Sequence, residues 1–145
     1  MAEPATGPVA AEGPAQSPLA TGPGRVLVAV YGVFALAATS RAAVQIATDF
    51  HEAPLAYLLS AFSAVVYVLA TVALARGWRR AAVLAVSVEL VGVLVVGTVS
   101  LLAPSDFPRA TVWSGYGSGY GFVPLVLPVL GLWWLRRRHA DPTPP

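Results

Sequence analysis

The sequence predicts an all-α protein: a four-helix transmembrane bundle with a disordered N-terminal tail. The chain of 145 residues is 57% hydrophobic and only 11% charged, whereas soluble domains are roughly 45–50% apolar and about 25% charged. Its apolar residues are concentrated in long blocks and do not follow an amphipathic pattern. One block, residues 81–102, is long enough to cross a bilayer, because about 20 helical residues span the hydrocarbon core of roughly 30 Å.

Four spans are expected between two tails. Residues 1–24 contain five Pro and four Gly, so they bury too little surface to fold and are expected to form a disordered tail. Residues 139–145 form a second, shorter tail. The fourth span is interrupted by Pro124 and Pro128, and its start is the least defined boundary. We place the spans at residues 26–47, 54–75, 81–102 and 118–135.

The distribution of charge predicts the topology and the partners. All nine basic residues are Arg, and in a four-span chain only Arg41 and Arg109 fall on the side opposite the termini. The positive-inside rule therefore places both termini in the cytoplasm of a multi-pass protein of the cell membrane, with the lipid bilayer as its main partner. The net charge of +2 is too small and too localised to suggest nucleic acid. The chain has no Cys, which excludes disulfides and thiolate metal sites.

Each span carries one face of small or polar residues at helical spacing, opposite a face of Leu, Val and Phe. On the third span this face includes Glu89, the only ionisable residue between positions 81 and 102. Small residues let helix backbones approach closely in lipid, so we expect Glu89 to face protein. The other faces comprise Tyr31, Ala35, Ala38, Ala42, Gln45 and Asp49 on the first span, Ala56, Ser60, Ser63, Ala64, Tyr67 and Thr71 on the second, and Gly117, Gly121, Pro124 and Pro128 on the fourth.

Glu89 is the leading candidate for an intramembrane proton or polar site. Tyr67 lies at the same expected depth and is the best candidate to donate a hydrogen bond to its carboxyl, with Ser63 and Ser60 on the same face. Water and, less favourably, an ion pair with Arg41 are alternative partners. An acid at this depth is often functional, as a proton or cation site, but a structural carboxyl inside the bundle explains the sequence equally well.

A second polar cluster lies at the outer end of the first span. Three interpretations remain for it: a small extracellular-side site, a metal site at His51, or a helix end that emerges into water. The last is favoured, because one His with neighbouring acids is weak evidence for a metal. The cluster comprises Arg41, Gln45, Asp49, His51 and Glu52.

A tandem Ser-Gly-Tyr-Gly repeat occupies residues 114–121. Gly-Tyr-Gly is also found in potassium-channel filters, which follow Thr-Val directly, but here Trp113 and Ser114 intervene and the preceding stretch is too short for a pore helix. We expect a flexible aromatic loop on the outer surface.

The overall layout resembles that of small four-span actinobacterial integral membrane proteins with no assigned activity. This resemblance covers residues 25–138 and rests on composition and span layout. No nucleophile–base pair, phosphate loop or metal triad is evident, so we expect neither enzymatic activity nor a cofactor. The leading hypothesis is a non-enzymatic accessory or complex-forming subunit, as a homo-oligomer or within a larger complex. The alternative is a proton-coupled exporter that works as a dimer through Glu89. Small multidrug resistance exporters have a similar layout, although their acid lies in the first span.

Overall fold

The computed structural model describes residues 22–140, with side chains as far as Arg137. Within this range every regular element is helical, which confirms the predicted all-α bundle. The expected tails at residues 1–24 and 139–145 lie almost entirely outside the described residues. The elements are α1 (Pro23–Asp49), the 3-10 helix η2 (Phe50–Glu52), α2 (Pro54–Arg76), α3 (Arg79–Leu102), the 3-10 helices η3 (Pro104–Asp106) and η4 (Ser114–Tyr120), and α4 (Val123–Ala140).

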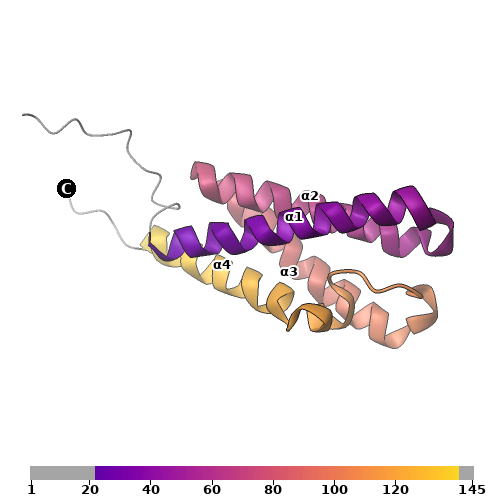
Figure 1. The fold of residues 1–145 in the computed structure, drawn as a ribbon. Coiled ribbons are helices and arrows are strands. Elements are labelled where there is room, and N and C mark those ends of the chain that lie inside the picture. The colour runs from indigo at the N-terminus through magenta and orange to yellow at the C-terminus, as the bar shows by residue number, and fades with distance from the viewer. Residues whose placement is uncertain (1–21, 141–145) are drawn as a thin grey trace, which may run out of the picture.

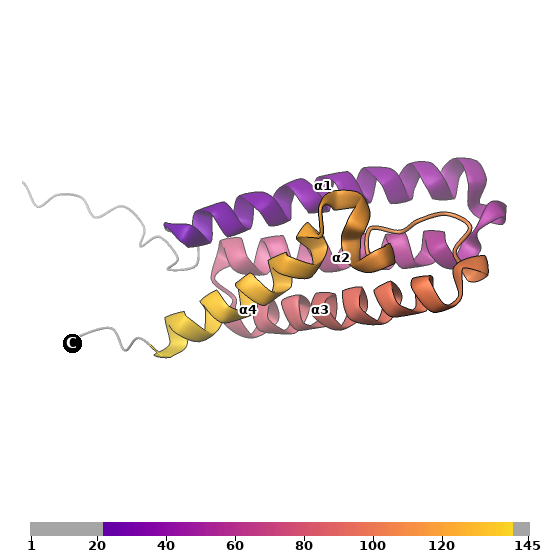
Figure 2. The same ribbon diagram turned by 90° about the horizontal axis from the view of Figure 1, so that it is seen from below.

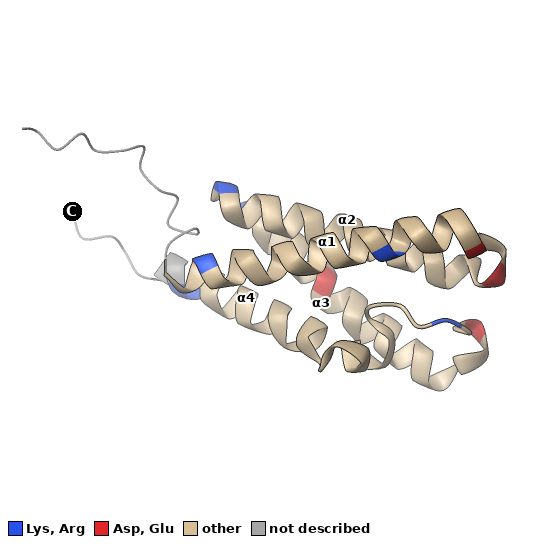
Figure 3. Cartoon of the chain, viewed as in Figure 1, with Lys and Arg blue, Asp and Glu red and all other residues tan. Residues whose placement is uncertain are grey.

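Three of the helices, α1, α2 and α3, are each long and apolar enough to cross a membrane. A fourth candidate span combines η4 with α4, which are bent by 100° relative to each other. The fold is therefore compatible with a multi-pass membrane protein. Both ends of the described chain lie at one end of the bundle, beside the α2–α3 link (Figure 1). We call this the arginine-rich end, and the opposite end, where η2 and η3 lie, the loop end (Figure 3).

Proline and glycine set the helix boundaries. Pro23 and Pro54 occupy the first turns of α1 and α2, where the missing N–H costs nothing. Gly77 ends α2 in the left-handed conformation with φ 72°. Its N–H donates to Leu74 O (3.3 Å), and the Trp78 N–H donates to Ala73 O (2.9 Å). This is a Schellman motif, and it lets α3 begin two residues later, antiparallel to α2.

The fourth span differs from the predicted continuous helix that begins at residue 118. Regular α-helix starts only at Val123, because Gly121 and Phe122 both have positive φ, 63° and 60°. Backbone in that conformation cannot continue a right-handed helix. Pro124 then falls in the first turn of α4, while Pro128 lies inside the helix, and both rings are fully buried.

Helices adjacent in the chain pack against each other, whereas α1 and α4 make only a small contact. Toward the loop end, η4 packs against both α3 and α4 (Figure 2). The predicted small and polar faces form most of the interior: Tyr31, Ala38, Ser63, Ala82 and Glu89 are all buried. Most Leu, Val and Phe side chains on α1–α3 point outward, as expected for lipid contact.

Candidate functional site

Glu89 lies on α3 at the centre of the bundle, and its side chain is 0% exposed. Tyr31 on α1, also 0% exposed, donates its hydroxyl proton to Glu89 Oε2 at 2.6 Å. The other carboxyl oxygen, Oε1, is buried and has no hydrogen-bond partner among the described residues. The expectation that Glu89 faces protein is confirmed, and its bond to Tyr31 links two helices that are far apart in the sequence.

Tyr67, the partner predicted for Glu89, lies close enough to the Glu89 carboxyl to interact with it electrostatically. The Tyr67 hydroxyl oxygen accepts a hydrogen bond from the Trp113 indole N–H (3.1 Å). The predicted Tyr67–Glu89 hydrogen bond stays a prediction, and the Tyr31 donor was not foreseen because the sequence analysis placed the start of the first span three residues too late. Since α1 begins at Pro23, Tyr31 is its ninth residue, Glu89 is the eleventh of α3, and Tyr67 is the tenth from the end of α2. All three side chains therefore lie at a similar depth.

The two serines expected near Glu89 lie on the same buried face of α2 as Tyr67 but closer to the loop end. Ser63 Oγ donates to the Ser60 carbonyl oxygen (2.8 Å), whereas Ser60 Oγ is buried without a partner among the described residues. Neither forms a hydrogen bond with Glu89. The polar groups around the carboxyl are therefore the two tyrosines.

Trp113 closes this centre on the loop side, and it is 1% exposed. Its ring packs on Gly92 of α3, where an added Cβ would lie 2.5 Å from the indole. Tyr116 packs in the same way on Gly97, with 2.3 Å to an added Cβ, and its hydroxyl is 2.8 Å from Thr98 Oγ1. The prediction of a flexible loop on the outer surface was wrong: two glycines of α3 leave space in which these aromatic side chains pack against the helix.

The backbone of this segment is held in an unusual conformation. Gly115, Tyr116 and Gly117 have φ of 56°, 60° and 83°, the left-handed region that is costly for a residue with a side chain. The Gly115 N–H donates to Ser100 Oγ on α3 at 2.9 Å. The Ser-Gly-Tyr-Gly repeat thus forms a tight left-handed turn against α3.

Arg41 on α1 does not reach Glu89. Its guanidinium donates to the Tyr120 hydroxyl (2.7 Å) and to the Ala110 carbonyl oxygen (2.6 Å). The alternative ion pair between Arg41 and Glu89 is therefore not formed. Arg41 instead holds the segment after η3 against α1.

The other members of the outer polar cluster do not converge with Arg41. Asp49 Oδ2 accepts from its neighbour Thr48 (3.1 Å), and the His51 ring lies 5.9 Å from the Phe50 ring. Glu52 forms an exposed ion pair with Arg109 (3.0 Å). Gln45 Oε1 is buried without a described partner. Among the described residues, no group of three His, Cys, Asp or Glu side chains is placed to hold a metal.

A cavity of about 450 Å³ lies beside Arg41 at the loop end. Its walls come from α1, from the end of α3, from η4 and from the segment between η3 and η4. Glu89 is not among the lining residues. These are Arg41, Ser100, Leu101, Phe107, Ala110, Thr111, Ser114, Gly115, Ser118, Gly119 and Tyr120.

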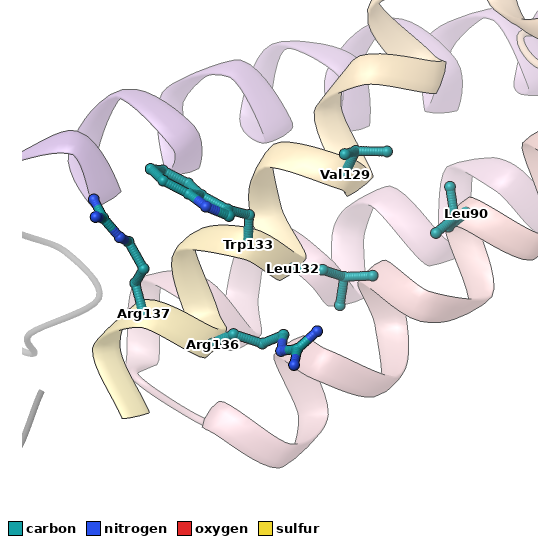
Figure 4. Close-up of a pocket in the computed structure, with 6 residues that line it drawn as sticks. All are labelled: Leu90, Val129, Leu132, Trp133, Arg136 and Arg137. Atoms are coloured by element: carbon teal, nitrogen blue, oxygen red, sulfur yellow. The ribbon is translucent and has the colours of Figure 1, made fainter. Parts of the chain in front are cut away.

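The arginine-rich end has a groove of a different kind, about 420 Å³, between α3 and α4 (Figure 4). Leu90, Val129 and Leu132 line its apolar part. The Arg137 guanidinium lies 4.7 Å from the centre of the Trp133 ring, in a cation–π contact. Aromatic and basic side chains side by side are typical of a membrane interface.

Comparison with known proteins adds no family: no protein-family model, no curated protein and no solved structure matches the chain.

The structure assigns a part in this region to four residues that the sequence analysis did not place in a site. Tyr31 was placed on the correct face, and counting from Pro23 would have matched its depth to that of Glu89. Gly92 and Gly97 are five residues apart on α3, a spacing that leaves room for two bulky groups. Trp113 gave no comparable signal, because an aromatic residue beside a loop is usually an interfacial anchor.

Proposed function

We propose that this protein is a non-enzymatic integral membrane protein of a bacterial cell membrane, with both termini in the cytoplasm. In this proposal it works as a small helical subunit, beside a second copy or within a larger membrane complex. The supporting observation is the sealed position of Glu89, which is 0% exposed, bonded to Tyr31 and covered by the buried Trp113. The carboxyl is placed to hold α1 and α3 together and does not meet a solute.

The topology is supported by the position of the basic residues. Arg25, Arg76, Arg79, Arg80, Arg136 and Arg137 lie at the arginine-rich end (Figure 3), which the positive-inside rule assigns to the cytoplasm. Because the chain has no Cys, single-cysteine variants test this directly. A membrane-impermeant maleimide is expected to label Ser105→Cys in intact cells and Ser17→Cys only after permeabilisation. The reverse pattern would contradict the topology.

The structural role of Glu89 is tested with Glu89→Ala, Glu89→Gln and the exposed control Glu52→Gln. Glu89→Ala is expected to lower the melting temperature in detergent, because it removes the acceptor of the Tyr31 hydrogen bond. Glu89→Gln keeps an acceptor oxygen and is expected to remain folded, and Glu52→Gln, which removes only an exposed ion pair, is expected to lower the melting temperature slightly at most. An unchanged melting temperature in Glu89→Ala would refute the structural role.

Subunit behaviour is tested in native membranes. Chemical crosslinking of the tagged full-length chain, followed by mass determination of the purified product, is expected to yield a species heavier than the monomer. A second copy gives twice the chain mass, and a larger complex gives a different mass. A product that stays monomeric at every crosslinker concentration would refute the subunit proposal.

The alternative, a proton-coupled exporter, is favoured by one observation: Glu89 Oε1 is buried without a described hydrogen-bond partner, and a proton can occupy that position. The test uses proteoliposomes that contain a trapped pH-sensitive dye and receive ethidium as the transported cation. Under the subunit proposal, wild type and Glu89→Gln are both expected to match empty liposomes. Ethidium-dependent proton flux that is present in wild type and lost in folded Glu89→Gln would establish the exporter instead.

A further inference from the structure

The loop-end cavity combines a single charged side chain with several hydroxyl groups. Arg41 lies in the wall formed by α1, in the second half of a helix long enough to span a membrane. Thr111, Ser114 and Ser118 line the opposite wall, where Thr111 Oγ1 and Ser114 Oγ are 3.0 Å apart. No acidic residue is among the described residues that line this cavity. Its walls therefore present one positive charge and polar groups that can donate hydrogen bonds.

Arg41 has no described counter-charge. Its two hydrogen bonds go to neutral oxygens of Tyr120 and Ala110, and no carboxylate of the described residues lies within 4.0 Å of its guanidinium. A guanidinium has five N–H donors, so these two bonds leave donors free. A charge held in partly apolar surroundings is costly unless it is paired, and an anion in the cavity would supply the missing partner.

The same two hydrogen bonds fix the guanidinium in place before any ligand arrives. Arg41 donates to a side chain of η4 and to the backbone before it, so its planar group is held at the cavity wall. A rigid guanidinium suits the bidentate recognition of carboxylate or phosphate oxygens. Gly115 and Gly119 also line the cavity, and an added Cβ at Gly119 would meet nothing within 4 Å.

We propose that this cavity binds an oxyanion group, carried either by a free small anion such as phosphate or by the phosphodiester of a phospholipid headgroup. Arg41 supplies the charge, and further donors come from the Ser118 hydroxyl and from one hydroxyl of the Thr111–Ser114 pair, whose other proton bonds within the pair. Leu101 and Phe107 form the apolar part of the wall and contact the uncharged part of the ligand. This site does not depend on the role of Glu89 or on the subunit proposal.

The test uses the purified full-length protein in two arms. In the first, thermal unfolding in a neutral detergent is followed by Trp fluorescence in potassium phosphate and in potassium chloride of equal ionic strength. In the second, native mass spectrometry counts the phospholipids retained after reconstitution with phosphatidylglycerol or with phosphatidylcholine. A melting temperature raised by phosphate identifies a free anion as the ligand, and one tightly retained phospholipid identifies a headgroup.

Three variants separate this site from general electrostatic attraction. Arg41→Gln removes the guanidinium proposed to bind the oxyanion. The affinity for the oxyanion is expected to fall roughly 10-fold or more, as for a lost charge-assisted hydrogen bond. Arg109→Gln is the matched control: it makes the same charge change at the same end of the bundle, on a side chain that is 60% exposed. It is expected to keep the full response.

Gly119→Leu fills the cavity and leaves Arg41 in place. An added Cβ at Gly119 meets nothing within 4 Å, so this variant is expected to fold. If Arg41→Gln fails to fold, Gly119→Leu decides whether the cavity binds the oxyanion. Loss of the response in Gly119→Leu supports the site. The proposal is overturned if wild type responds in neither arm, if Gly119→Leu keeps the full response, or if Arg109→Gln loses as much as Arg41→Gln.

Discussion

Two regions of this bundle contain an ionisable group within a membrane-length helix, and they accommodate it in opposite ways. Glu89 is enclosed completely, with a tyrosine hydroxyl as its partner and a tryptophan between it and the loop end. Arg41 is only partly buried, bonds to neutral oxygens and borders a cavity. We propose that the enclosed carboxyl serves packing and that the guanidinium, which has spare donors beside open space, meets a ligand.

Trp113 belongs to the enclosed region: its ring packs on Gly92, three residues from Glu89 on α3, and it does not line the Arg41 cavity. Trp113→Ala is expected to destabilise the protein by about 3–5 kcal/mol, the range for truncating a large buried aromatic residue. It also removes the donor to the Tyr67 hydroxyl. Urea unfolding in mixed micelles, followed by circular dichroism, measures the change. The control is Trp133→Ala, whose side chain is 53% exposed and whose loss is expected to be far smaller. Equal losses in the two variants would mean that Trp113 does not form part of the core.

Gly92 and Gly97 of α3 allow Trp113 and Tyr116, from the segment between α3 and α4, to pack against the helix. Gly97→Ala is expected to cost about 1–3 kcal/mol, as for overpacking, because the new Cβ would lie 2.3 Å from the Tyr116 ring. Gly119→Ala adds the same methyl group where nothing lies within 4 Å and is expected to leave stability nearly unchanged. Comparing the two melting temperatures isolates the close contact. If Gly97→Ala proves as stable as Gly119→Ala, Tyr116 does not pack on α3 as described.

The sequence was sufficient to predict the helices and their buried faces, because both follow from runs of apolar residues and from helical periodicity. It placed Glu89, Ser63 and Tyr67 inside, and all three are buried. The predicted second span, residues 54–75, matches α2 within one residue, since Pro54 and Gly77 at its ends have local backbone preferences that need no tertiary context.

The sequence did not reveal how the segment between α3 and α4 folds back. That path depends on two close contacts: the Trp113 ring packs on Gly92, and the Tyr116 ring packs on Gly97. These contacts join residues 19–21 positions apart, so no periodic pattern in the sequence predicts them. The Tyr31–Glu89 bond was missed because it depends on helix depth, and an error of three residues in the start of α1 was enough to leave Tyr31 out. Arg41 was assigned to a solvated helix end because its partners, Tyr120 and Ala110, belong to the same unforeseen segment.

Tyr31→Phe tests the sealed region without altering its shape. Removing the hydroxyl leaves a buried carboxyl without its described donor, at a cost of about 1–2 kcal/mol given the modest strength of hydrogen bonds within membranes. Tyr57→Phe is the matched control, because Tyr57 is 2% exposed and no hydrogen bond of its hydroxyl is among those described. Thermal unfolding of both variants in one detergent is the measurement. A loss in Tyr57→Phe equal to that in Tyr31→Phe would show that the Glu89 contact contributes nothing specific.

The smallest effect is expected at the Glu52–Arg109 ion pair, which lies at the loop end like Arg41 but faces water. Its side chains are 53% and 60% exposed, and exposed pairs contribute roughly 0–1 kcal/mol and are screened by salt. Glu52→Gln is therefore expected to lower the melting temperature slightly in dilute buffer and not at all in about 1 M salt, where the Debye length is near 3 Å. Melting curves at both salt concentrations test this. A large loss that persisted at high salt would mean that the pair anchors the segment before η4, and that the Arg41 cavity depends on it.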